Sequence, residues 1–553
     1  MLKNEINQLI KNIVGEKINF GVSRPPKNMP FDLATNAAIA VARLKNTSPM
    51  SAAEKLAKEL RATKIFSAVE VASPGFINLR FNWDFLWKQL EENERNFLTN
   101  LARNSIWSKK KILLEFVSAN PTGPLHIGHG RGAALGDSLG RILAAAGAKV
   151  VREYYVNDAG NQIDNLTNSV LGRIQQLLGE SKKFCGEYQG EYLLTLAKKI
   201  LQETKNPEAS YVRHRTVDLI IEEISHSLNN FGVHFDNWVY ESSLLKNNNL
   251  EKNLAELSRR GLLEEKDGAL WFKSSRLADT EDRVLRRRDG RFTYFATDIL
   301  YHRQKLQRGF DYLINLWGAD HHGYVARLRA AIAGLKYPPQ ILQIVLYNLV
   351  TLKRAGKVVA MSTRTGEFIT LDEVVKEIGQ DVLQQRGLPA DQQTLIRIGR
   401  DICRFFFVFR EPTSPLEFDL DLAKKQSAEN PIFYIQYAHA RICSIFHQAE
   451  KQAIARDKAR IRWEVLNEPE RKLILQILSF ADTVLTCAEK LSPHYLANYL
   501  IDTVREFHTY YDTNRVLGNE PEITLARLAL LDQLRKTIAT GLNLLGISAP
   551  EKM

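Results

Sequence analysis

The feature that most constrains the fold is an apolar run that leads through a Pro- and Gly-rich loop into an amphipathic helix. Residues 111–117 (Lys-Ile-Leu-Leu-Glu-Phe-Val) have the length and composition of a buried strand. The following loop contains Asn120, Pro121, Gly123 and Pro124. One apolar face then recurs at helical spacing, made by Leu135, Leu139, Ile142, Leu143 and Ala146, and Gly147 ends it. A strand–loop–helix unit of this kind predicts an α/β fold.

Two histidines three residues apart, His126 and His129, stand where this helix should begin. A helix N-terminus presents unpaired N–H groups and a positive dipole, so it suits an anion. Both imidazoles can reach a phosphate held there, and Gly128 leaves room for a base or ribose against the backbone. The pattern favours a nucleotide triphosphate, although His-x-x-His alone is more typical of metal ligands or surface residues.

Length and charge indicate several domains and a polyanionic partner. A chain of 553 residues is too long for one core and suggests roughly three or four domains. The formal charge of +12 and the pI near 9.3 favour a phosphate-rich partner without deciding it.

The cysteine spacing and the apolar pattern bear on the compartment. The four cysteines, Cys185, Cys403, Cys443 and Cys487, form no Cys-x-x-Cys pair, which argues against a structural zinc site and a disulfide framework. We expect buried free thiols in a reducing compartment. No segment approaches the ~18 uninterrupted apolar residues of a membrane span, so we expect a cytoplasmic protein without membrane contact.

Periodicity divides the chain into three predicted domains, with a Rossmann-like parallel sheet in the middle one. Residues 1–105 form a small α+β unit, with helices over 6–13, 33–44 and 52–60 and strands over 65–71 and 76–81. Residues 106–370 alternate strands and helices, with further strands at 150–156, 312–317 and 341–347 and a helix at 324–335. Segment 161–289, including turn-rich residues 235–238, is expected to be inserted. Residues 371–553 are predicted to be an all-α helical bundle.

Candidate ligand-binding residues lie where two of these strands end. Glu115 interrupts a strand that should be buried on both faces, where an unpaired carboxylate is costly, so either a ligand or an internal Arg or Lys must meet it. After the strand at 312–317, Gly318 permits close approach to a nucleoside and Asp320 can accept ribose hydroxyls. His321 and His322 leave a second possibility open, metal ligation together with the first histidine pair.

These motifs resemble those of a known family. Residues 115–130 (Glu-Phe-Val-Ser-Ala-Asn-Pro-Thr-Gly-Pro-Leu-His-Ile-Gly-His-Gly) closely resemble the first signature of arginyl-tRNA synthetases, a class I aminoacyl-tRNA synthetase family. Residues 294–298 resemble the family's Tyr-x-x-x-Asp element, and the similarity extends to the C-terminal residues 544–553. Without this resemblance, Asp298 would be interpreted as a surface residue beside a core tyrosine.

The resemblance implies roles for these residues. Arginine is expected to contact Glu115, Asn120, His126, Tyr294, Asp298 and His322. ATP is expected to contact His126, Gly128, His129, Gly318, Asp320, His321 and Met361. Two carboxylates and a phenol match the five donors of a planar guanidinium, whereas the point charge of lysine would leave acceptors unpaired. A bound arginine would then supply the missing partner of Glu115, and no editing domain is evident.

The last signature is matched only in part. Residues 358–368 (Val-Val-Ala-Met-Ser-Thr-Arg-Thr-Gly-Glu-Phe) resemble the Lys-Met-Ser-Lys-Ser loop of class I synthetases, with Ala360 and Thr363 in the two lysine positions. Ser362 and Arg364 are expected to join His126 and His129 as catalytic residues. The missing cation on the departing pyrophosphate could come from Lys357, Arg364 or the cluster at residues 109–111.

The flanking domains are expected to contact tRNA. The resemblance assigns the tRNA elbow to the N-terminal domain, where Asn36 is a candidate, and the anticodon to the bundle. In the bundle, Tyr434, Tyr437, Arg441 and Arg515 could stack on or grip unpaired bases, as proteins commonly read single-stranded RNA. Most bundle aromatics are simply core residues, which is the competing interpretation.

The implied activity is ligation of arginine to its tRNA through arginyl-adenylate, by an enzyme that uses ATP with Mg²⁺, has no resident metal and is a monomer. Two alternatives stay open: another nucleotidyl transferase with the same fold, and a non-catalytic tRNA-binding paralogue.

Overall fold

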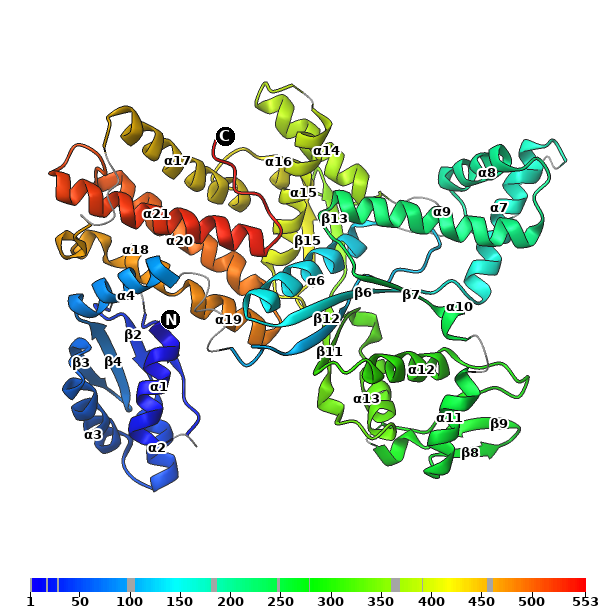
Figure 1. The fold of residues 1–553 in the computed structure, drawn as a ribbon, viewed down its shortest axis with the longest axis horizontal. Helices are drawn as coiled ribbons and strands as arrows, with labels where there is room; N and C mark the ends of the chain where they lie inside the picture. The colour runs from blue at the N-terminus through cyan, green and yellow to red at the C-terminus, as the bar shows by residue number, and fades with distance from the viewer. Residues whose placement is uncertain are drawn as a thin grey trace.

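The structure is a computed structural model. It describes residues 2–15, 18–26, 29–96, 105–180, 186–245, 249–277, 279–359, 369–389, 391–454 and 461–553. Figure 1 shows a parallel sheet at the centre, the N-terminal domain beside the C-terminal bundle at the left, and two inserted lobes at the right.

The centre of the molecule is a five-stranded parallel sheet in the order β12-β11-β5-β6-β7. Its strands are β5 (Lys111–Glu115), β6 (Lys149–Val156), β7 (Asn237–Tyr240), β11 (Tyr312–Gly318) and β12 (Leu342–Tyr347). The chain order reverses between β5 and β11, so the ligand crevice of an open parallel sheet is expected at the carboxyl ends of these two strands. The parallel pairing and the strand order confirm the predicted α/β class with a Rossmann-like sheet.

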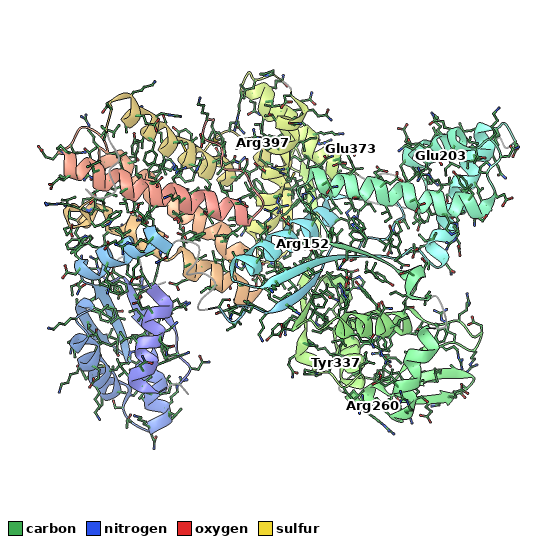
Figure 2. All side chains as sticks on the ribbon, in the orientation of Figure 1. Arg152, Glu203, Arg260, Tyr337, Glu373 and Arg397 are labelled. Atoms are coloured by element: carbon green, nitrogen blue, oxygen red, sulfur yellow. The ribbon has the colours of Figure 1, made fainter. Side chains whose placement is uncertain are left out.

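Strand β7 corrects one prediction. Residues 235–238 were expected to be a turn inside an insertion, but Asn237–Tyr240 forms the edge strand of the main sheet and pairs with β6. The segment 161–289, predicted to hold insertions, therefore contains two, one on each side of β7. The helices α7 (Asn161–Leu177), α8 (Glu191–Glu203) and α9 (Ala209–Asn230) form an arm, on which Figure 2 labels Glu203.

The second insertion follows β7 and forms the lobe at the lower right of Figure 1. It contains α10 (Glu241–Leu244), α11 (Asn249–Arg259), β8 (Leu263–Lys266), β9 (Ala269–Phe272), η2 (Ser274–Leu277) and β10 (Arg283–Arg286). Three of these elements make a small antiparallel sheet, β10-β9-β8. The helices α12 (Tyr294–Gln307) and α13 (Tyr324–Gly334) return the chain to the main sheet, with η3 (Ala319–His321) before α13 and η4 (Pro339–Ile341) after it.

Helix α6 (Ile127–Ala145) follows β5 and is buried on most sides. Its glycines permit close packing: a Cβ on Gly130 would lie 2.7 Å from Leu371 and 3.0 Å from Phe407, and one on Gly132 would lie 2.5 Å from the Tyr347 hydroxyl. These contacts fix the first turn of α6 against the helices that follow the sheet.

The N-terminal domain has the predicted α+β character. Its antiparallel sheet has the order β1-β2-β4-β3. The elements are α1 (Leu2–Val14), β1 (Val22–Ser23), β2 (Leu33–Thr35), α2 (Ala37–Lys45), α3 (Pro49–Ala62), β3 (Phe66–Ala72), β4 (Phe76–Phe81) and α4 (Trp83–Asn96). The helix predicted over residues 33–44 is wrong at its start, because Leu33–Thr35 pairs with β4 as a strand.

The C-terminal region is largely the predicted bundle. Its helices are α14 (Leu371–Gln385), α15 (Gln392–Phe409), α16 (Leu420–Lys424), α17 (Pro431–Lys451), η6 (Trp463–Val465), α18 (Glu468–Leu478), α19 (Phe480–Lys490), α20 (His494–Thr513) and α21 (Pro521–Leu544). One strand interrupts it: β15 (Leu416–Asp419) pairs in parallel with β13 (Val350–Arg354), which also pairs with β14 (Lys357–Val358). The domain limits at residues 105 and 370 stay a prediction.

The N-terminal domain packs against the bundle through charged groups. The Arg471 guanidinium of α18 lies 2.6 Å from the Asp32 carboxylate, with both side chains nearly inaccessible to solvent, and stacks over Trp83. Asp482 of α19 accepts a hydrogen bond of 2.8 Å from the backbone N–H of Lys3.

Three of the four cysteines, Cys403, Cys443 and Cys487, are buried free thiols, as expected, and Cys185 lies outside the described residues. Across the described part of the chain, every helix is too short or too polar to cross a bilayer.

Candidate active site

The two histidines of the first motif lie at the start of α6. His126 is its N-cap and its Nδ1 accepts a hydrogen bond of 3.1 Å from the Gly128 N–H. The His129 Nδ1 accepts one of 3.4 Å from the His126 N–H, and the two rings stack with centroids 3.8 Å apart. The pair thus caps the helix reciprocally, which explains why both side chains face its N-terminal end.

This geometry sets the protonation state of both rings. Burial lowers the pKa of His126, and burial together with the neighbouring His126 lowers the pKa of His129 to about 3. Both imidazoles are therefore neutral near pH 7. Because each Nδ1 accepts a backbone hydrogen bond, the ring proton resides on Nε2. The site presents two neutral N–H donors at a helix N-terminus, an arrangement that suits phosphate oxygens.

At the end of β5, the structure decides the partner of Glu115. The chain turns sharply there, with Val117 at φ 65° and Ser118 at φ 39°. Glu115 forms a buried ion pair with the Lys305 ammonium of α12, and its other oxygen lies 3.3 Å from the Ser118 hydroxyl. The hypothesis that an incoming guanidinium is needed to neutralise Glu115 is therefore wrong, because an internal lysine already does so.

Asp298, by contrast, forms no ion pair within the described part of the chain. It lies on α12, accepts a hydrogen bond from the Tyr324 hydroxyl, and has no Lys or Arg nitrogen within 4 Å among the described residues. Burial raises its pKa to about 7, and the negative charge of Glu115 adds to this effect. Tyr294, one turn earlier on α12, is 58% exposed and directs its hydroxyl toward Gly160.

Glu241 is a pocket residue that sequence reasoning missed. It follows the last residue of β7 and is 5% exposed. Burial raises its pKa to about 7, and the negative charge of Asp298 adds to this effect. The two residues lie on α10 and α12, which pack against each other. The signal was a carboxylate directly after the strand-forming residues 238–240 (Trp-Val-Tyr), whereas the turn was predicted over residues 235–238. Among the described residues, the site therefore has two buried carboxyl groups, Asp298 and Glu241, that form no ion pair within 4 Å, although the charges of Lys305 and Arg327 act on Asp298.

The structure places the other predicted ligands around the same edge of the sheet. The Asn120 amide donates a hydrogen bond of 2.8 Å to the Gln162 side chain of α7, which connects the loop after β5 to the helical arm. Gly318 ends β11, and a Cβ there would collide with the Asp320 carboxylate. Asp320 lies 3.6 Å from His321, and both are exposed on η3. His322 follows η3 and is exposed.

The metal alternative for the four histidines gains no support. Within the described residues, no group of three or more His, Cys, Asp or Glu side chains has metal-binding geometry.

Part of the last signature cannot be placed. Met361, Ser362 and Arg364 lie outside the described residues, as do Ala360 and Thr363. Of the candidate cations, the cluster at residues 109–111 is excluded, because it lies at the amino end of β5, beside Asp311, on the opposite edge of the sheet from the crevice. Lys357 lies exposed on β14 and stays a candidate.

Three predicted RNA-contacting residues come together on the bundle. Tyr434, Tyr437 and Arg441 lie on α17, where Tyr434 stacks on His508 of α20 at 4.6 Å and Arg441 lies 5.2 Å over Tyr511. Tyr437 is 41% exposed. Tyr437 and Arg441 are therefore open to solvent on this face, whereas Tyr434 and Tyr511 are half-buried against the core, as the competing interpretation expects.

The remaining two RNA candidates lie apart from this face. Arg515 is exposed beyond the end of α20. Asn36 is the N-cap residue of α2, and its carboxamide oxygen accepts 2.7 Å from the Gly21 N–H.

A parallel sheet with a histidine pair capping the helix after its first central strand is the arrangement of class I aminoacyl-tRNA synthetases. The family model "tRNA synthetases class I (R), catalytic domain" matches residues 95–386. The models "Arginyl tRNA synthetase N terminal domain" and "DALR anticodon binding domain" match residues 1–81 and 435–553. Together with these matches, the relatives below show that the chain belongs to the arginyl-tRNA synthetase family.

Two curated relatives are named arginine–tRNA ligase. The protein of Syntrophotalea carbinolica is 44% identical over 94% of this chain and 93% of its own length. That of Carboxydothermus hydrogenoformans is 42% identical over 97% of this chain and 95% of its own length. The solved Thermus thermophilus arginyl-tRNA synthetase superposes with a TM-score of 0.81 at 25% identity and full coverage of both chains.

Proposed function

We propose that this protein ligates arginine to tRNA in two steps, using ATP and forming arginyl-adenylate as the intermediate. The observation that carries the proposal is the pair of buried carboxyl groups without an ion pair among the described residues, Asp298 and Glu241, at the carboxyl edge of the sheet that also holds the histidine pair. No other common amino acid side chain brings a planar, permanently charged fork to such a pair.

The arginine side chain enters with its guanidinium toward Asp298 and Glu241. Bidentate guanidinium–carboxylate hydrogen bonds replace the proton that the raised pKa values retain in the empty pocket. Tyr294 borders this pocket from the same face of α12. Glu115, held by Lys305, keeps one oxygen beside Ser118 and receives the α-ammonium group. Asn120 and His322 are the remaining residues that we predict to contact arginine.

ATP lies along the start of α6, with its phosphates against His126 and His129 and its ribose toward Gly318 and Asp320. An oxygen of the arginine carboxylate attacks the α-phosphorus, and pyrophosphate leaves. Neutral Nε2–H donors stabilise the developing charge on the phosphate oxygens without losing a proton. The described residues offer no carboxylate cluster for a resident metal, so Mg²⁺ is the companion of the nucleotide phosphates.

The second step transfers the arginyl group to a terminal ribose hydroxyl of tRNA, and AMP leaves. The exposed aromatic face of α17 and α20 supports anticodon binding by the bundle, since stacked rings hold unpaired bases. We further propose a monomer in the cytoplasm.

The decisive experiment is aminoacylation of total tRNA with each of the twenty amino acids. We expect arginine alone to be attached, and pyrophosphate exchange to occur with arginine alone. The His129→Ala variant should lose activity by about 10²-fold or more, the scale of losing one transition-state donor. Arginine-independent activity, or full activity of the variant, would contradict the proposal. Absence of ligation with retained tRNA binding would favour the non-catalytic paralogue.

A further inference from the structure

A turn rich in arginine lies between β10 and α12 and has no role in the site described above. Residues 286–291 read Arg-Arg-Arg-Asp-Gly-Arg, four cations in six positions. The turn belongs to the second insertion, the lobe of α11 and β8–β10 in Figure 1.

Backbone hydrogen bonds give this turn a defined shape. The Arg287 N–H donates 2.9 Å to the Arg291 carbonyl, and the Gly290 N–H donates 3.0 Å to the Arg287 carbonyl, with Gly290 at φ 82°. Arg286 and Phe292 form an antiparallel bridge at its base. The side chains of the turn are therefore displayed from a closed hairpin.

Two of the four arginines are left without an acidic partner. Arg286 pairs with Glu265 at 2.8 Å, and Arg291 pairs with Asp289 at 2.6 Å. Arg287 and Arg288 are exposed, and neither has a carboxylate within 4 Å in the described part of the chain. Adjacent exposed guanidinium groups of this kind fit phosphate oxygens, which they can hold through paired N–H donors.

The position of the turn indicates which phosphates these are. Tyr294 is three residues after Arg291, and the intervening Thr293 is fixed by a 2.8 Å hydrogen bond from its N–H to the Leu285 carbonyl. The turn therefore ends within about 10 Å of Tyr294, which we place at the border of the arginine site and whose hydroxyl faces Gly160. The last phosphates of a tRNA whose terminal ribose lies at an arginine bound beside Tyr294 are therefore within reach of this turn.

We propose that Arg287 and Arg288 bind the phosphates of the single-stranded 3′ end of tRNA and hold its terminal nucleotide at the arginine pocket. This assignment rests on the proposed function, because it takes tRNA as the second substrate. The interaction is electrostatic and independent of base identity, since guanidinium–phosphate contacts position a strand without reading its sequence.

The test is a comparison of two variants and two RNAs. The variant R287Q/R288Q removes both charges and keeps side-chain length. The control R259Q/K336Q removes two exposed cations that have no carboxylate partner in the described chain. They are the sequence neighbours of Arg260 and Tyr337, which Figure 2 labels in the lower right part of the molecule. Each protein is titrated with intact arginine-accepting tRNA and with the same tRNA lacking its three 3′-terminal nucleotides.

We expect R287Q/R288Q to bind intact tRNA at least fivefold more weakly than the wild type, and to bind the truncated tRNA as the wild type does. The slope of log affinity against log salt for intact tRNA should fall by about 1.4, roughly 0.7 for each lost single-strand phosphate contact. The rate of arginyl transfer from preformed adenylate should fall, while the KM values for arginine and ATP stay unchanged. The control should match the wild type with both RNAs.

Equal losses with intact and truncated tRNA would overturn the assignment to the 3′ end, and no loss with either would overturn RNA binding by this turn. Failure of the proposed function is distinguishable, because the wild-type protein would then attach no arginine to tRNA whatever the variants bind.

Discussion

At the scale of single residues, the crevice holds more negative charge than the protein neutralises. Lys305 balances Glu115, and Arg308 lies 2.5 Å from Glu153 nearby, whereas Asp298 and Glu241 have no such partner among the described residues. Asp298 and Glu241 are therefore the two groups that we propose as partners of a cationic ligand.

The Glu241→Gln substitution should raise the KM for arginine by about 30- to 5,000-fold, because loss of one partner from a buried charged pair costs about 2–5 kcal/mol. The KM for ATP should stay unchanged in pyrophosphate exchange. Glu264→Gln, which breaks only a surface pair with Lys273, serves as the control and should change neither constant. An unchanged KM for arginine in the Glu241 variant would remove Glu241 from the pocket.

The raised pKa values also predict how arginine binding depends on pH. Both carboxyl groups have a pKa of about 7, and only their charged forms bind a guanidinium. The Kd for arginine, measured by calorimetry, should therefore increase as the pH falls below 7, by up to about tenfold per pH unit for each carboxyl.

Stability without arginine should change in the opposite direction. The folded-state pKa of each carboxyl lies above its ordinary value, so the arginine-free folded protein binds protons more tightly than the unfolded chain. Its free energy of unfolding should therefore increase, through these two carboxyl groups, as the pH falls from 8 toward 5.

For arginine binding, a Kd that is constant between pH 6 and 8 would contradict the prediction, because it would show that both groups are already ionised before arginine binds.

The Lys305→Met substitution should lower the free energy of unfolding by about 3–5 kcal/mol in urea titrations, because it leaves the Glu115 carboxylate buried without its partner. The double variant K305M/E115Q should recover much of that loss and still bind arginine poorly. The control Lys353→Met breaks an exposed pair with Glu417 and should cost only about 0–1 kcal/mol. A double variant as unstable as the single one would argue against the pair.

At the scale of elements, α6 joins the nucleotide site to the helices that follow the sheet. His126 forms an antiparallel bridge with Thr370, and the Leu371 N–H donates 2.8 Å to the Leu125 carbonyl. The buried Arg131 donates to the Asn348 carbonyl at 2.6 Å. The first turn of α6 thus has its position set by segments far along the chain.

The Gly130→Ala substitution should lower the free energy of unfolding by about 1–3 kcal/mol, since its Cβ would overlap Leu371 and Phe407. It should also lower kcat for pyrophosphate exchange, because the histidine pair moves with the helix. Gly21→Ala, whose Cβ would meet only the Asn36 side chain at 3.7 Å, is the stability control. Wild-type kcat and stability in the Gly130 variant would show that this contact relaxes freely.

At the scale of the whole molecule, the N-terminal domain and the bundle are joined across a long stretch of sequence. Asp32 and Arg471 are 439 positions apart, and Figure 1 shows the N-terminal domain lying beside α18 and α19. The two domains that are expected to contact tRNA therefore form one continuous side of the protein.

The Arg471→Met substitution should lower the free energy of unfolding by about 3–5 kcal/mol, because Asp32 stays buried without its cation. Limited proteolysis should then cut preferentially between the N-terminal domain and the rest of the chain. Arg505→Met, which breaks an exposed pair with Asp502, should leave both measurements unchanged. Unaltered proteolysis of the Arg471 variant would mean that apolar contacts alone hold the domain.

The sequence by itself determined the features that depend on neighbouring residues. Strand β5, helix α6 and the histidine pair at its start follow from periodicity, capping and dipole, which act within one or two turns. The Tyr294–Asp298 spacing determined a shared helical face in the same way. These local rules sufficed for the α/β class and for the edge of the sheet that carries the site.

Only the tertiary structure decided which groups meet across the chain. Glu115 and Lys305 are 190 positions apart, and no local pattern distinguishes an internal lysine from an incoming arginine as the partner of a buried carboxylate. Residues 237–240 became a strand because β6 offered a free edge, and that pairing placed Glu241 beside Asp298. The proposed guanidinium site is thus a product of long-range packing, whose energy depends on partners that only folding brings within reach.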